Sequence, residues 1–192
     1  MTVREILQIG HPALRRPARE VAPGELASGA VQELIDDLID TMRHARGAGL
    51  AATQVGEDLR IAVMEVEANE RYPYKPPLPL TVAVNPVVTF NPAGPTFMVN
   101  EGCLSVPLRG DVRRHMDITV TYLDRHGEPL TGRVTGLTAG TWQHEVDHLD
   151  GILFTDRVED PTTLATWDEF SRHHRQEFID RLRAGGLAPA PE

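Results

Sequence analysis

The sequence predicts an α+β fold in a single domain. Segments with a helical pattern and segments with a strand pattern both occur, but they do not alternate regularly, as they would in a parallel α/β sheet. The chain has 192 residues, of which 41% are hydrophobic, and this length supports one domain with one core. We expect the domain to span residues 1–184 and residues 185–192 to form a flexible tail.

The first regular element that we expect is an amphipathic helix over residues 25–46. Its apolar residues recur at steps of three and four, which places them on one face of the helix. They are Val31, Leu34, Ile35, Leu38, Ile39 and Met42. Gly47 and Gly49 come next, and they end the helical pattern.

Four later segments have the β-branched and apolar composition of strands. They are RIAVMEV (60–66), LTVAV (80–84), DITVTYL (117–123) and, more weakly, TGRVTG (131–136). Four prolines in residues 69–79 predict a loop, which either frames a site or is a plain surface insertion. DRHGE (124–128) predicts a turn between antiparallel strands, with Gly127 at positive φ.

Two further helices are expected towards the end of the chain. The first spans residues 138–150, and the second spans residues 163–184. In the second helix, five apolar residues are spaced to face the core: Leu164, Trp167, Phe170, Phe178 and Leu182.

Composition argues against several classes of protein. No apolar run approaches the ~18 residues that cross a bilayer, and the first ten residues lack the layout of a secretory signal. A single cysteine excludes an internal disulfide and suits a reducing compartment. The formal charge of -9 disfavours broad binding to nucleic acid. We therefore expect a cytoplasmic protein that binds neither membranes nor specific nucleic-acid sequences.

The clearest chemical motif is QHEVDHLDG, residues 143–151. On a helix, residues four apart share a face, so His144 and His148 can hold one metal ion. Glu145 lies about 100° round the helix from His144, where its carboxylate reaches a water on the metal without being a ligand. Two imidazoles and a carboxylate that moves a proton are what metal-dependent hydrolysis needs. A solvated helix with a chance HExxH match is the alternative.

The third metal ligand decides the chemistry, and the spacing leaves two choices. The metzincin extension fails because Phe154 stands where a third histidine is needed. A thermolysin-like site would use Asp168 or Glu169 downstream. Upstream, EGCLSVP holds the only thiol, Cys103, and a thiolate is an excellent ligand for a divalent transition metal. A lone cysteine is also often a small buried residue without a role in binding.

A third motif, GAGLAATQVG (47–56), partly fits the dinucleotide-binding pattern GxGxxA. That pattern requires a strand before it and a helix after it, whereas here a helix precedes and a strand follows. Nucleotide binding is therefore not expected. The glycines instead allow the backbone to come close to a substrate.

These three motifs, in this order and at these separations, resemble those of the peptide deformylases over about residues 6–158. The resemblance implies mixed and antiparallel strands packed around a central helix with the HExxH motif, followed by a C-terminal helix. It implies a metal ion held by Cys103, His144 and His148, usually iron(II), with zinc, nickel or cobalt as alternatives. The reaction would be hydrolytic removal of formate from the N-terminal formyl-methionine of new polypeptides.

The resemblance also implies roles for individual residues. Glu145 would carry the proton, while the Gln54 amide and the backbone N–H of Leu104 would stabilise the charge on the attacked oxygen. The peptide would pair in an extended form with the chain near Gly49. The pocket for the methionine side chain would include Ala48, Leu104, Leu137, Thr141 and the face of His144.

The sequence departs from the family pattern at two places. After Pro107 the chain is one residue shorter than in many members, so Arg109, Arg113 and Arg114 are alternatives for the arginine of the site. Gly140 and Thr141 replace residues that are often bulkier, which widens the rim of the pocket.

The substrate also suggests partners. Nascent peptides emerge at the ribosome, so the last helix, with its arginines, is a candidate contact near the exit tunnel, and we expect a monomer. The arginines are Arg172, Arg175, Arg181 and Arg183. Two other functions stay open: a small zinc peptidase with a downstream acidic ligand, and a non-catalytic relative that keeps the fold. The intact Glu145 and Cys103 argue against the second.

Overall fold

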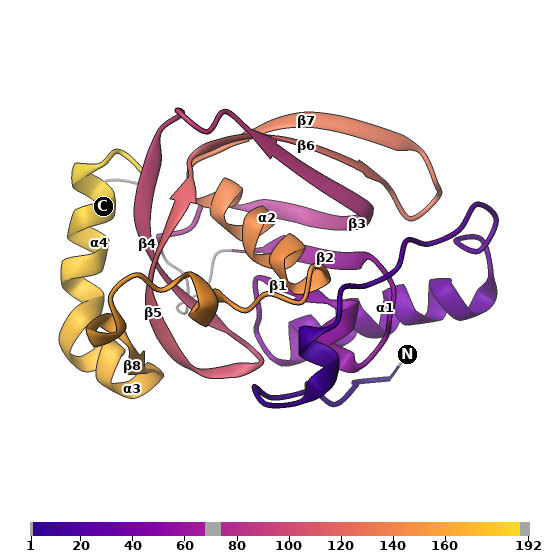
Figure 1. Ribbon diagram of the computed structural model, residues 1–192, viewed down its shortest axis with the longest axis horizontal. Coiled ribbons are helices and arrows are strands. Elements are labelled where there is room, and N and C mark those ends of the chain that lie inside the picture. The colour runs from indigo at the N-terminus through magenta and orange to yellow at the C-terminus, as the bar shows by residue number, and fades with distance from the viewer. Residues whose placement is uncertain (1, 68–73, 189–192) are drawn as a thin grey trace.

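Two antiparallel sheets and the helix between them form the frame of the fold (Figure 1). The computed structural model describes residues 2–67 and 74–188. The five-stranded sheet has the order β1-β2-β3-β6-β7, and the three-stranded sheet has the order β4-β5-β8. The strands are β1 (Gly49–Ala51), β2 (Ile61–Val66), β3 (Leu78–Phe90), β4 (Thr96–Cys103), β5 (Val106–His115), β6 (Asp117–Leu123), β7 (Pro129–Thr135) and β8 (Ala165–Thr166). The helices are α1 (Gly29–His44), α2 (Gly136–Leu149), α3 (Trp167–Glu169) and α4 (Arg175–Ala184).

Helix α2 is the central element of this frame. It contacts β1, β2, β3, β6 and β7 of the larger sheet and β5 of the smaller one. In Figure 1 it runs through the middle of the molecule, in orange, with strands around it. The expected α+β class and the antiparallel pairing are therefore confirmed. No helix in the described ranges has the length and apolar character to cross a membrane.

Helix α1 packs its apolar stripe against β1 and β2. It begins later than the expected residue 25, because the Ser28 hydroxyl caps the helix by accepting a hydrogen bond from the N–H of Val31. It ends at His44, since Arg46 takes a left-handed φ of 52° that no helix can continue through. All six predicted apolar residues of this helix are buried.

The β6–β7 hairpin agrees closely with its prediction. Strand β6 has the expected bounds, and Gly127 in the turn has a φ of 89°. The Asp124 carboxylate accepts hydrogen bonds from the N–H groups of His126 and Glu128, which closes the turn. Strand β3 is longer than expected, because its pairing with β6 resumes after an irregularity between Val84 and Val87.

The hairpin of β4 and β5 was not expected from the sequence. Its strands carry Asn100, Glu101, Arg109 and Arg114, and all four are buried. Polar residues at buried positions remove the alternation of apolar and polar residues that marks a strand. The residues of EGCLSVP form the tip of this hairpin, where Cys103 pairs with Val106.

The prediction of one helix over residues 163–184 was wrong. Residues 165–166 instead form β8, which pairs with β5. The Thr166 hydroxyl then caps α3, and five π-helical residues, Phe170–His174, connect α3 to α4. The short strand displaces the start of the helical segment, because its backbone groups bond to β5 rather than along a helix.

The C-terminal helix packs over the smaller sheet, at the left in Figure 1. Phe170, Phe178 and Leu182 are buried in one apolar cluster with residues of both sheets. Leu187 and Ala188, in the tail that we expected to be flexible, also pack against this cluster. The remaining tail residues, 189–192, lie outside the described part of the chain.

Candidate active site

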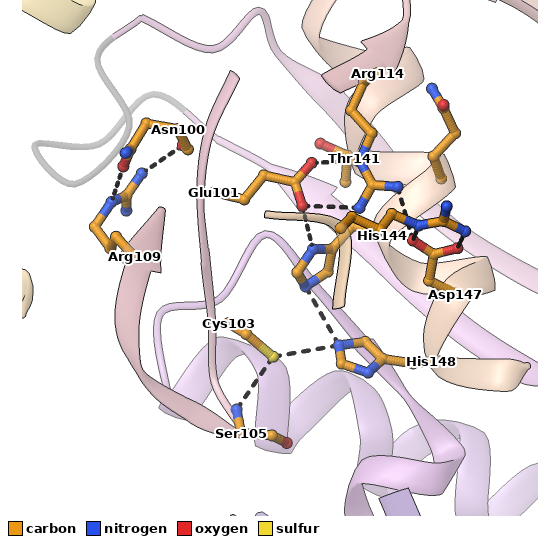
Figure 2. A network of polar contacts seen from close by, with 12 residues as sticks. Asn100, Glu101, Cys103, Ser105, Arg109, Arg114, Thr141, His144, Asp147 and His148 are labelled. Atoms are coloured by element: carbon orange, nitrogen blue, oxygen red, sulfur yellow. Dashed lines mark hydrogen bonds and ion pairs between the residues drawn. The ribbon is translucent and has the colours of Figure 1, made fainter. Parts of the chain in front are cut away.

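Cys103, His144 and His148 meet at one point (Figure 2). Their donor atoms all lie within 4.8 Å of one another. The Sγ of Cys103 is 3.2 Å from the Nε2 of His148, which is 3.3 Å from the Nε2 of His144. Among the described residues, this is the group of three side chains placed to hold a metal ion. The two downstream acids of the peptidase alternative, Asp168 and Glu169, are exposed on α3, and neither belongs to this group.

The chemistry of the three side chains fits a divalent transition metal. A thiol and two imidazoles are common ligands of such ions. Burial and the neighbouring His144 hold the pKa of His148 well below its usual range, so its ring is neutral, as a ligand must be. Burial opposes protonation of His144, but Cys103 and Glu101 raise the pKa of its ring well above the usual value. These two groups thus attract positive charge to the point where a metal ion would lie.

Glu145 enters the site beside the two histidines. It is buried, and burial raises the pKa of its carboxyl group to about 7. One of its oxygens, Oε2, has no hydrogen-bond partner in the part of the chain that the structure describes. The backbone of Gly49 passes so close that a β-carbon there would overlap the Glu145 carboxylate. Glycine at position 49 therefore leaves room for the Glu145 side chain, in addition to any room that it leaves for a substrate.

Gln54 is fixed next to the thiol by the turn that follows β1. Its Oε1 accepts a hydrogen bond from the N–H of Ala51 at 2.8 Å. This directs its Nε2 towards Ser105 Oγ, at 3.1 Å, and Cys103 Sγ, at 3.5 Å. The N–H of Ser105 also donates to the Cys103 sulfur, at 3.3 Å. The motifs GAGLAATQVG and EGCLSVP are thus in direct contact.

One cleft brings together nearly all of the residues that the sequence singled out. It is lined by Ala48, Gly49, Gln54, Cys103, Leu104, Leu137, Thr141, His144 and Glu145. His148 is not among the lining residues, and it is held behind the cleft by Cys103. The structure adds Tyr74 and Lys75 to the wall, so the described end of the proline-rich loop frames the site. Residues 69–73 of that loop lie outside the described ranges.

A chain of buried charges orients His144 from behind (Figure 2). Its Nδ1 is 2.9 Å from a carboxylate oxygen of Glu101. Arg114 donates two hydrogen bonds to Glu101, at 2.7 and 2.9 Å, and a third to Asp147, at 2.7 Å. Asp147 is held in turn by Arg157. Burial alone would raise the pKa of Glu101, but the Arg114 guanidinium holds it well below the usual range.

Comparison with known proteins agrees with this geometry. The family model for polypeptide deformylase matches residues 3–163. The chain belongs to this family. It is 41% identical to peptide deformylase 2 of Nostoc sp. over 168 residues, which cover 86% of this chain and 91% of that one. It is 43% identical to peptide deformylase 2 of Pseudomonas putida over 163 residues, 82% of this chain and 89% of the relative.

Solved structures of the family have the same fold. The class I type b peptide deformylase of Acinetobacter baumannii with bound Met-Ala-Ser is 37% identical, with a TM-score of 0.78 over 82% of this chain and 99% of that one. The peptide deformylase of Thermotoga maritima is 32% identical, with a TM-score of 0.72 over 83% of this chain and 100% of that one.

The sequence left three arginines as alternatives for the arginine of the site, and in the structure each of them has a different partner. Arg114 is the one that binds the buried Glu101. Arg109 instead donates to the side chain and the backbone carbonyl of Asn100, both at 2.8 Å. Arg113 points outward and pairs with the exposed Glu159. The site contribution of Glu101 and Asp147 was not predicted, although both acids lie inside the quoted motifs.

Replacing Arg114 with Met is expected to destabilise the fold strongly, because Glu101 and Asp147 would keep buried charges without this partner. Removing one side of a buried ion pair typically costs ~3–5 kcal/mol. Arg113→Met is the matched control, because an exposed pair contributes only ~0–1 kcal/mol. Urea unfolding of both variants measures the difference. Equal, small losses would contradict the assigned role of Arg114.

Proposed function

We propose that the chain hydrolyses the formyl amide of N-terminal formyl-methionine in newly synthesised polypeptides and releases formate. The observation that carries this proposal is the convergence of Cys103, His144 and His148 beside the buried Glu145, at a cleft that all of them but His148 line. Membership of the polypeptide deformylase family supports the same reaction. The relative from Acinetobacter baumannii is described with bound Met-Ala-Ser, the peptide that deformylation of formyl-Met-Ala-Ser would leave.

The reaction has two difficulties: water is a poor nucleophile, and the carbon of the formyl amide is a poor electrophile. Water attacks an amide slowly, and negative charge builds on the formyl oxygen during the attack. A divalent ion held by Cys103, His144 and His148 would supply Lewis acidity, bringing the pKa of water at the site towards ~7. We propose iron(II) as the native ion, and the same ligands also accept zinc, nickel or cobalt.

Glu145 is the proposed proton carrier. A pKa of about 7 lets its carboxyl group accept and return a proton near neutral pH. In this role the carboxylate takes the proton of the attacking water and delivers it to the nitrogen of the departing methionine. Its burial keeps bulk water from competing for that proton.

Gln54 and Leu104 are proposed to bind the oxygen on which charge develops. The hydrogen bond from Ala51 N–H fixes the Gln54 side chain so that its NH₂ group lies on the side of the thiol. Leu104 follows Cys103 directly, at the tip of the hairpin, and its backbone N–H is the second proposed donor. A donor of this kind typically contributes ~3 kcal/mol to the transition state.

The peptide is proposed to add to the free edge of the larger sheet. Within residues 2–67 and 74–188, strand β1 is the first strand in that sheet and pairs there only with β2. Gly49, at its start, lines the cleft, so an extended peptide can form main-chain hydrogen bonds next to it. The methionine side chain would then lie in the part of the cleft formed by Ala48, Leu137 and Thr141.

Two alternatives receive less support from the site. A peptidase with a downstream acidic ligand would need Asp168 or Glu169, but Glu169 is exposed and pairs with Arg172. Burying the Glu145 carboxylate costs stability. A non-catalytic relative would have no need for a carboxylate at this buried position.

A ribosome contact through the C-terminal helix remains a proposal, as do action as a monomer and a cytoplasmic location. The cytoplasm is where formylated nascent chains arise, although one relative, from Arabidopsis thaliana, is named chloroplastic/mitochondrial. Arg172 is exposed and Arg175 is half-buried, and neither is in the buried apolar face of the helix, so we propose these two for such a contact.

Glu145→Gln is expected to keep the metal and lose turnover, because the amide cannot accept the proton. General acid–base catalysis typically contributes ~10²–10⁴-fold to the rate, so kcat/KM for formyl-Met-Ala-Ser should decrease by at least this factor. An anaerobic formate assay measures turnover, and metal analysis of the same sample checks the site. Asp150→Asn, exposed at the end of the same helix, is the control. A normal rate in Glu145→Gln would remove the assigned proton carrier.

Cys103→Ser is expected to abolish tight metal binding, because a serine hydroxyl stays protonated and is a poor ligand. Metal content of protein purified without oxygen measures this directly. The double variant Asp168→Asn, Glu169→Gln should retain the metal. The opposite pattern, with metal kept in the first variant and lost in the second, would favour the peptidase.

Arg172→Glu together with Arg175→Glu is expected to weaken co-sedimentation with ribosomes severalfold, because the ribosomal surface is largely RNA phosphate. Arg133→Glu, on the exposed strand β7, is the control for a change of charge alone. Unchanged co-sedimentation in the double variant would exclude this face of the helix as the contact.

A further inference from the structure

Lys75 is the only lysine in the chain, and it lies in the active-site cleft. Every other basic residue among the 19 lysines and arginines is an arginine. The Nζ of Lys75 donates a hydrogen bond to the hydroxyl of Thr141, at 3.0 Å. Thr141 lies on α2, one helical turn before Glu145, and it is labelled in Figure 2. The lysine therefore reaches the wall of the proposed methionine pocket.

Two small residues of α2, Gly140 and Thr141, line the cleft together with Lys75. Among the described residues, a β-carbon at Gly140 would lie within 4 Å only of the Cγ of Arg114, at 3.9 Å, which is an ordinary van der Waals distance. A bulky residue at either Gly140 or Thr141 would take up room on the wall that Lys75 now shares.

The residue before Lys75 fixes the position of the lysine. Tyr74 is buried and packs edge-on against Phe178 of α4, with ring centroids 5.2 Å apart. Its hydroxyl also lies 3.5 Å from a guanidinium nitrogen of Arg109. The described start of this segment is thus anchored to the C-terminal helix, and Lys75 is held against the cleft.

The ammonium is an unusual group in this part of the cleft. Ala48, Val99 and Leu137 give the neighbouring wall an apolar character. Burial lowers the pKa of Lys75 to about 8, while the carboxylates of Glu101 and Glu145 favour its charged form. A thioether sulfur is a weak hydrogen-bond acceptor, so a methionine side chain gains little from this ammonium. A side chain that ends in an oxygen would accept a stronger, charge-assisted hydrogen bond from it.

We propose that Lys75 determines side-chain specificity by donating a hydrogen bond to the end of the first side chain of the substrate. The pocket would then accept N-formyl residues whose side chain carries an oxygen acceptor. Formyl-methionine sulfoxide is the compound of this kind that is most similar to formyl-methionine. Oxidation of methionine makes its side chain polar without lengthening its carbon chain. The proposal rests on the deformylase function.

The test compares three substrates: formyl-Met-Ala-Ser, its methionine sulfoxide form, and its norleucine form, which lacks any acceptor. In Lys75→Met, which keeps length and removes the donor, the ratio of kcat/KM for sulfoxide over norleucine should fall about tenfold or more, as expected for a hydrogen bond to a charged group. In Lys75→Arg, which keeps a charged donor, the ratio should fall less. A ratio that is the same in the wild type and Lys75→Met would overturn the proposal.

A binding measurement on the wild-type protein decides the question without turnover. Reductive ¹³C-methylation labels Lys75 as the only lysine, apart from the α-amino group. Titration with the product peptides should shift the Lys75 signal further, and at lower concentration, for the sulfoxide form than for the norleucine form. Equal shifts and affinities would overturn the proposal. Absence of formate release from every substrate would instead count against the deformylase function, and the titration would still decide the role of Lys75.

Discussion

The hydrogen bond between Glu101 on β4 and the Nδ1 of His144 on α2 joins the smaller sheet to the central helix, and the site depends on it. A buried carboxylate is tolerated only where counter-charges and donors surround it. Arg114 on β5 supplies that charge and also binds Asp147 on α2, one turn from the histidine. Because each member of this network needs the others, the hairpin and the helix can meet in only one register. Bending or sliding either element would leave a charge buried without its partner.

This register explains how ligands from two separate elements come to one point. Cys103 lies at the tip of the β4–β5 hairpin, two residues after Glu101, so fixing Glu101 also fixes the thiol. His144 is oriented by Glu101 through its Nδ1, which leaves its Nε2 directed at the sulfur and at His148. Orientation of a ligand through its second nitrogen is a common feature of metal sites. The residues behind the ligands therefore matter as much to the geometry as the ligands themselves.

The sequence predicted the chemistry of this site better than it predicted the fold around it. The spacing of His144 and His148 follows from helix geometry alone, so it can be read without the structure. Strands β4 and β5 could not be recognised, because their buried positions carry Glu101, Arg109 and Arg114, whose burial is stabilised only by contacts distant in the chain. The break before α3 was missed for a similar reason, since the pairing of β8 with β5 is a tertiary contact that overrides the local helical pattern. Lys75 gave no signal, because its place in the cleft depends on a contact with Thr141, which is distant in the chain.

The C-terminal helical segment, residues 167–184, also helps to position the active site. The Arg109 guanidinium lies over the rings of Trp167 and Phe170, at 4.2 and 4.4 Å from their centroids. Its hydrogen bonds hold Asn100, which is next to Glu101. Phe178 of the helix supports Tyr74 and, through it, the segment that carries the pocket lysine. Cation–π and apolar contacts on one face of the helix thus position the wall of the cleft. A partner that binds the opposite, arginine-bearing face would act on an element that already determines the shape of the substrate pocket.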